Sequence, residues 1–164
     1  MSNISMTTSK RNAIVTVMLI SAFVSMLNQT ILNTALPAII KGLNITETTA
    51  QWLITGFMLV NGIMIPLTAF LMDKYSTRHL YIFSMAIFLI GSIVAAFSPT
   101  FSILMISRII QAIGAGILLP LMQFTVFTLF PAEQRGFAMG LAGVAVQSAP
   151  AIGPTLTCLL YTSP

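Results

Sequence analysis

The chain has 164 residues, of which 57% are hydrophobic and only 6% are charged. A soluble domain carries about 25% charged residues, so seven basic and three acidic side chains are too few to cover a soluble globule. This composition disfavours a soluble enzyme and a disordered chain. It also disfavours a nucleic-acid-binding protein, because the basic residues are scattered rather than clustered into a phosphate-binding patch.

Five apolar stretches are each long enough to cross a bilayer, which takes about 20 residues of helix. They cover residues 12–40, 51–72, 80–97, 102–130 and 136–157. Apolar and polar residues do not alternate in them as they do in barrel strands. We therefore predict an all-α, polytopic transmembrane bundle. The first stretch is too long for the core of a signal peptide, which has about 7–15 residues, so we expect a retained span preceded by an N-terminal tail at residues 1–11.

The basic residues outside these stretches predict the orientation of the chain. Five of them flank the stretches on one side of the membrane: Lys10, Arg11, Lys74, Arg78 and Arg135. The other side has only Lys41. The positive-inside rule then places the N-terminus in the cytoplasm.

Arg108 is the only charged residue inside the predicted spans. A central arginine costs about 2.5–3.5 kcal/mol on insertion scales and usually marks a functional site. Asn28 lies at a similar depth in the first span, and Gln111 lies one turn from Arg108 on the same helix face. We expect these three to line one polar site. For Asn28, Gln111 and Asn61, interhelical hydrogen bonding is an equally good interpretation.

The fifth stretch combines small residues with prolines. Ala145, Ala149 and Gly153 recur every four residues and form one smooth face, where another helix can approach closely. Pro150 and Pro154 each remove a backbone donor, so we expect this helix to be kinked or locally unwound.

The sequence has no group of residues typical of an enzyme or a metal centre. His79 is the only histidine and Cys158 is the only cysteine. We place His79 in a solvated loop and predict neither a metal ion nor an organic cofactor.

Four segments together resemble the major facilitator superfamily, and within it the QacA/EmrB-type drug:proton antiporters, which have fourteen spans. Residues 27–37 resemble the motif L-D-x-T-I-V-N-V-A-L-P of the first span, and residues 69–78 resemble the gating loop G-x-L-x-D-R-x-G-R-[KR]. Residues 104–116 resemble the fourth-span motif L-x-x-x-R-x-x-Q-G-x-G, and residues 149–154 resemble the fifth-span antiporter motif. The four motifs occur in the expected order on the matching spans.

The resemblance implies that the chain forms the first five helices of a transporter whose two halves rock around a midplane site. It implies proton-driven export of small lipophilic, often cationic, compounds across a bacterial cytoplasmic membrane. The partners would be the lipid bilayer, these compounds and the missing C-terminal half of the same chain, with no nucleic acid involved.

The resemblance also implies roles for single residues. Arg108 would take part in proton coupling, with Asn28 and Gln111 on the same substrate and proton pathway. The gating loop would use Asp73, Lys74 and Arg78 to latch the outward-open state. The fifth-span motif would use Ala149, Gly153 and Pro154 to shape the helix and limit leakage.

Some positions depart from the family pattern. Asn28 stands where many members have an acidic residue, and the three acidic residues, Glu47, Asp73 and Glu133, all lie outside the predicted spans. A proton-carrying carboxylate therefore lies further along the chain, or the coupling differs.

The length corresponds to about a third of a complete member, at about 20 residues per span plus loops. Residues 158–164 leave the family pattern abruptly, and we interpret them as a non-native tail fused to a truncated gene. Two alternatives remain open: a transporter of another small molecule in the same superfamily, and a small membrane protein that assembles with a partner.

Overall fold

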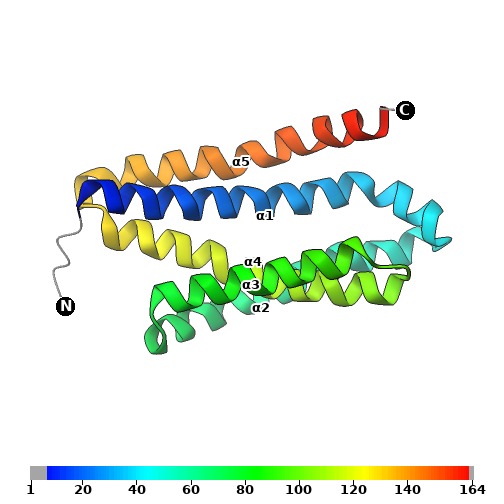
Figure 1. Ribbon diagram of the computed structural model, residues 1–164, viewed down its shortest axis with the longest axis horizontal. Helices are drawn as coiled ribbons and strands as arrows, with labels where there is room; N and C mark the ends of the chain where they lie inside the picture. Colours follow the sequence, from blue (N-terminus) through cyan, green and yellow to red (C-terminus); the bar gives the residue numbers. More distant parts are fainter. Residues whose placement is uncertain (1–6, 163–164) are drawn as a thin grey trace.

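The computed structural model describes residues 7–162, in which all regular structure is α-helical. The five helices are α1 (Thr8–Leu43), α2 (Glu47–Lys74), α3 (Thr77–Ala96), α4 (Phe101–Leu129) and α5 (Ala132–Thr162) (Figure 1). Each has a stretch long and apolar enough to cross a membrane. The predicted all-α, polytopic bundle is confirmed. Residues 1–6 of the predicted tail, and residues 163–164, lie outside the described part of the chain.

The helices extend beyond the predicted apolar stretches, and the predicted loop position of His79 is wrong, because this residue lies in a helix. Lys41 lies in the last turn of α1, and Asp73 and Lys74 end α2. Arg78 and His79 lie in the first turn of α3, where the His79 Nδ1 and the Ser76 Oγ are hydrogen-bonded at 2.6 Å. Polar side chains outside the hydrocarbon do not interrupt backbone hydrogen bonding, so helices continue until a turn residue ends them.

Turn chemistry fixes the ends of the first connection. Asn44 adopts a left-handed conformation with φ 51°, and its N–H donates to the carbonyl of Ile40, which closes α1. Two residues later, the Thr46 hydroxyl accepts a hydrogen bond from the N–H of Thr49 at 3.2 Å and caps α2. The chain thus reverses within three residues.

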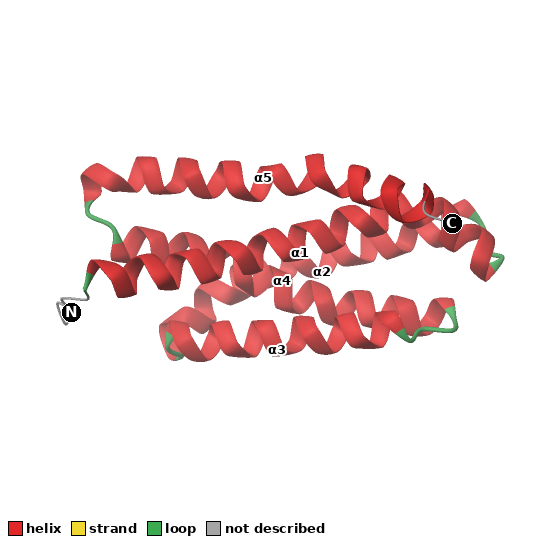
Figure 2. Cartoon of the chain, turned by 45° about the horizontal axis from the view of Figure 1, so that its top comes forward, coloured by secondary structure: helices red, strands yellow, loops and turns green. Residues whose placement is uncertain are grey.

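Helix α4 is the central element of the bundle. Over the most apolar part of each helix, α4 has 56% of its residues buried, whereas the other four have 22–28%. It packs mainly against α2 and α3, and it also contacts α1 and α5. Figure 2 shows α3 on one side of this group and α5 on the other. Because α4 contacts all the other helices, side chains on α4 can form contacts with each of them.

Glycines allow the close packing of α4. A Cβ on Gly114 would lie 2.7 Å from the carbonyl oxygen of Ser84, which belongs to the backbone of α3. A Cβ on Gly116 would lie 2.5 Å from the Cβ of Met64 in α2. Small residues at these two positions let the backbones approach, as is typical of membrane helices.

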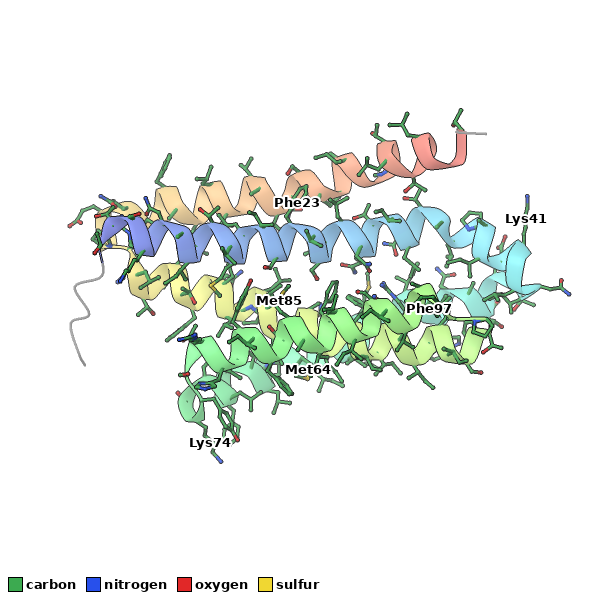
Figure 3. All side chains as sticks on the ribbon, viewed as in Figure 1. Phe23, Lys41, Met64, Lys74, Met85 and Phe97 are labelled. Atoms are coloured by element: carbon green, nitrogen blue, oxygen red, sulfur yellow. The ribbon has the colours of Figure 1, made fainter. Side chains whose placement is uncertain are left out.

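Helices α1 and α5 form a second group, although they are at opposite ends of the chain. They run side by side in both ribbon views (Figures 1 and 2). Lys41 and Lys74 lie at opposite ends of the bundle (Figure 3). We call the end that holds Lys10, Arg11, Lys74, Arg78 and Arg135 the basic end.

Of the two expected distortions of α5, a kink or local unwinding, unwinding is not observed, because the helix is continuous through Pro150 and Pro154. The axis of α5 instead bends in the C-terminal part of the helix, as Figure 2 shows. A proline removes one backbone donor and crowds the preceding turn, and a bend accommodates both effects without breaking the helix.

Candidate functional site: a buried arginine cluster

Arg108 lies in the interior of the bundle, seven residues after the first residue of α4. Its side chain is only 1% exposed and is one of the largest that are fully buried. The charge therefore faces protein rather than lipid, which is the placement expected for a charge inside a membrane span.

The guanidinium of Arg108 holds two neutral amide side chains. Its Nη1 donates to the Oε1 of Gln111 at 2.8 Å and to the Oδ1 of Asn28 on α1 at 3.3 Å. The Nε2 of Gln111 then donates to the Oγ of Ser92 on α3 at 3.1 Å. The structure thus places Asn28, Arg108 and Gln111 in one hydrogen-bonded group and adds Ser92 to it.

The aromatic ring of Phe57, on α2, completes this group. The guanidinium carbon lies 4.4 Å from the ring centroid, which is the geometry of a cation–π contact. We call Asn28, Phe57, Ser92, Arg108 and Gln111 the arginine cluster. It connects α1, α2, α3 and α4.

Close helix packing fixes the position of Gln111. A Cβ on Gly91 would lie 2.8 Å from the Cγ of Gln111 and 3.0 Å from the carbonyl oxygen of Ser107. The backbone of α3 therefore lies directly against α4 beside the cluster. This contact limits how far Gln111 can move away from Arg108.

Two donors of Arg108 have no acceptor among the described residues. Its Nε and Nη2 atoms are buried and make no hydrogen bond. The hydrogen-bonding capacity of the guanidinium is therefore only partly used, and leaving a buried charged donor without an acceptor is costly.

A cavity of about 570 Å³ adjoins the cluster. Asn28 and Ser92 line it, and so does Leu104, one turn before Arg108 on α4. Most of its other lining residues are apolar: Leu32, Ile39, Leu43, Ala95 and Ala96. Its size is within the range of sites for small molecules, about 300–1,000 Å³.

The structure places Asn61 outside the arginine cluster. Its Oδ1 is buried and has no hydrogen-bond partner within residues 7–162. A Cβ on Gly116 would lie 2.9 Å from this oxygen, so the amide packs against α4 without bonding to it. The interhelical hydrogen bond considered for Asn61 is not present there.

The predicted gating residues lie at the basic end and not in the arginine cluster. Asp73, Lys74 and Arg78 are all exposed, and Lys74 Nζ lies 4.7 Å from the ring centroid of Phe70. Only Tyr75 and Ser76 separate α2 from α3, so the motif consists of two helix ends and a short turn.

The predicted smooth face of α5 packs against α1. Ala149 is fully buried, and a Cβ on Gly153 would lie 2.6 Å from the Cγ2 of Thr30 on α1. Ala145 is partly buried on the same side, whereas Pro154 is exposed. The small residues thus lie at a helix interface, and both prolines point away from it.

Sequence reasoning missed two members of the arginine cluster. Ser92 carries a weak signal, since it is one of two serines in a largely apolar span. Phe57 carries none, because it is one of eleven phenylalanines and only packing selects it.

Comparison with known proteins agrees with the helical architecture. The pattern of the Major Facilitator Superfamily matches residues 18–164. An uncharacterized MFS-type transporter of Bacillus subtilis (strain 168), YcnB, is 54% identical over 147 residues, which are 90% of this chain and 31% of that protein.

Two further relatives have names that refer to resistance. The lincomycin resistance protein LmrB of Bacillus subtilis (strain 168) is 44% identical over 87% of this chain and 30% of its own length. The probable multidrug resistance protein EmrY of Escherichia coli (strain K12) is 34% identical over 84% of this chain and 27% of its own. The chain spans between 27% and 31% of the length of these three relatives. The family match over most of its length confirms the resemblance, and the chain belongs to the Major Facilitator Superfamily of membrane transporters.

Proposed function

We propose that the chain is the N-terminal segment of a proton-coupled multidrug exporter that works by alternating access. One observation carries this proposal most directly: a buried arginine at intramembrane depth links four helices beside a cavity of ligand size. Polar and charged groups inside a membrane span mark substrate and ion pathways. The resistance proteins among the relatives support export of small molecules as the activity.

In this proposal the basic end faces the cytoplasm. Five of the seven basic residues are there, as the positive-inside rule requires. Asp73, Lys74 and Arg78 then lie at the cytoplasmic ends of α2 and α3, where contacts with the other half of the transporter close the inner side. The contact of Gly153 with Thr30 holds α5 against α1 while the halves move.

Arg108 couples the movement of the helices to the ion pathway in this proposal. Its hydrogen bonds tie α1 to α4, and Gln111 extends the link to α3. Any change in the charge around the guanidinium alters these bonds. The carboxylate that carries the proton lies further along the full-length protein, because the acidic residues here are at helix ends.

The proposal predicts that Arg108→Ala abolishes export. The complete gene is expressed in a bacterial host that lacks its major exporters, and efflux of the neutral lipophilic dye N-phenyl-1-naphthylamine is followed by fluorescence in energised cells. We expect the variant to lose at least tenfold in efflux rate, because the amides of Asn28 and Gln111 lose their shared donor. A protonophore should stop efflux by the unmodified protein.

The matched control removes a basic residue that contacts no part of the cluster. Lys41 is exposed in the last turn of α1, so Lys41→Ala should leave efflux unchanged. Membrane expression of both variants is compared by immunoblot. Full efflux by well-expressed Arg108→Ala protein would contradict the role given to Arg108.

A further inference from the structure

Among residues 7–162, no acidic side chain balances the charge of Arg108. The acidic residues of the sequence are Glu47, Asp73 and Glu133, which lie in the end turns of α2 and α5. The groups that contact the guanidinium are an amide on α1, an amide on α4 and an aromatic ring on α2, and all are neutral. The cluster therefore has a net charge of about +1 in a region of low dielectric, where an anion is attracted strongly.

The unused donors of Arg108 have the geometry that a carboxylate needs. Nε and Nη2 are neighbours on one edge of the planar guanidinium, and both lack an acceptor among the described residues. An arginine binds a carboxylate through two parallel N–H···O bonds of this kind. An amine or an alcohol cannot supply two anionic acceptors to this edge.

The adjoining cavity determines the rest of the ligand. Asn28 and Ser92 are the two members of the cluster that line it, and Arg108 lies behind them. Ser98 is a further polar lining residue, and aliphatic side chains form most of the remainder. A ligand that fills this space needs an apolar body with one polar end. The volume of about 570 Å³ suits a body of one or two rings or a short alkyl chain.

We propose that Arg108 binds the carboxylate of a lipophilic organic anion, and that Asn28 determines this preference. The inference rests on the proposed export function and adds to it a preference, among lipophilic compounds, for those with an anionic group. Asn28 is decisive because its Oδ1 lies 3.3 Å from Nη1. An aspartate there would neutralise the guanidinium from within the protein, whereas the asparagine leaves its charge for a ligand.

Three naphthalene compounds of similar size test the charge preference. Binding of 1-naphthoate, 1-naphthylmethanol and 1-naphthylmethylammonium to the purified full-length protein in detergent is measured by isothermal titration calorimetry. We expect 1-naphthoate to bind at least tenfold more tightly than either of the other two. Equal or weaker binding of the carboxylate would overturn the proposal.

Asn28→Asp is the decisive variant, because it changes charge without changing shape. We expect it to weaken 1-naphthoate binding at least tenfold and to leave 1-naphthylmethanol binding within twofold. Asn33→Asp is the matched control, since it makes the same change on the same helix at an exposed residue. It should retain the carboxylate preference. Loss of the preference in both variants would overturn the assignment to Asn28.

Two other results have separate meanings. A carboxylate from elsewhere in the full-length protein could already be bound to Arg108. In that case the unmodified protein shows no preference for 1-naphthoate, and Asn28→Asp does not change the binding of 1-naphthoate. This result overturns the proposal. Efflux of N-phenyl-1-naphthylamine is measured in parallel. Normal dye efflux without carboxylate preference refutes only this inference, whereas absence of efflux of any compound refutes the proposed export function itself.

Discussion

At the scale of single residues, Gly114 is a position where the structure leaves no space for a side chain. An added Cβ would lie 2.7 Å from the carbonyl oxygen of Ser84 and 2.9 Å from the N atom of Phe88. Both are backbone atoms of α3, so neither can rotate away. We predict that Gly114→Ala destabilises the full-length protein by about 1–3 kcal/mol, as overpacking does in other cores.

The control for this substitution is Gly136→Ala. A Cβ there meets nothing within 4 Å, and alanine favours a helix over glycine by up to about 1 kcal/mol. Thermal unfolding of the two variants in detergent separates the effects. The midpoint should fall for Gly114→Ala and stay equal or rise for Gly136→Ala. A fall of equal size in both would contradict the packing argument.

The arginine cluster shows which residues of a site can be predicted from sequence. Arg108 and Gln111 are one turn apart on one helix, so their contact follows from helix geometry. The contact with Asn28 follows from matching depths in two spans, provided that the two helices meet. Phe57 could not be predicted, because its place depends on how α2 packs against α4, which no local pattern specifies.

At the scale of elements, α5 has two internal prolines, whereas α1, α2 and α4 have one each. Pro150 and Pro154 cannot donate to the carbonyl oxygens four residues earlier, those of Val146 and Pro150. The helix also has half the burial of α4, 28% against 56%. We predict faster amide hydrogen exchange in residues 145–157 than in residues 104–116, measured by mass spectrometry on the full-length protein.

The double variant Pro150→Ala/Pro154→Ala tests the cause. It restores two backbone hydrogen bonds, so exchange in residues 145–157 should slow by about tenfold per 1.4 kcal/mol of added local stability. Pro37→Ala in α1 is the control and should leave this segment unchanged. Equal exchange in α5 with and without its prolines would show that burial alone sets the rate.

The number and type of helices follow from hydropathy, but their ends do not. Apolar runs mark only the part of a helix that lies in hydrocarbon. The turns that carry Lys41, Asp73 and Arg78 continue the helices into a polar region. Their ends depend on local features such as the left-handed Asn44 and the Thr46 cap, whose signals are short and common in sequences.

At the scale of the whole molecule, the distribution of basic residues predicts a testable topology. Every native cysteine of the complete protein is replaced by serine, and single cysteines are introduced at Asn44 and Ser76, in the turns at opposite ends of the bundle. A membrane-impermeant maleimide should label Asn44→Cys in intact cells and Ser76→Cys only after permeabilisation. The reverse pattern would show that the basic end faces outward.

The order in which the helices pack was not predictable from the chain. Consecutive helices joined by short loops are usually neighbours, yet α2 and α3 touch each other far less than either touches α4. The reason lies in α4, where small residues at Gly114 and Gly116 let both neighbours approach. Spacing of glycines marks α4 as a packing helix but does not say which helices it meets.

The pairing of α1 with α5 also has a consequence for biosynthesis. Roughly 90 residues separate the end of α1 from the start of α5, which at about 5–20 residues per second takes about 5–20 s to synthesise. During that time the surface of α1 around Thr30, which later packs against Gly153, lacks this contact with α5. Helix α1 therefore leaves the ribosome well before its partner α5, and a chain stopped between them would leave that surface for lipid or for insertion factors to cover.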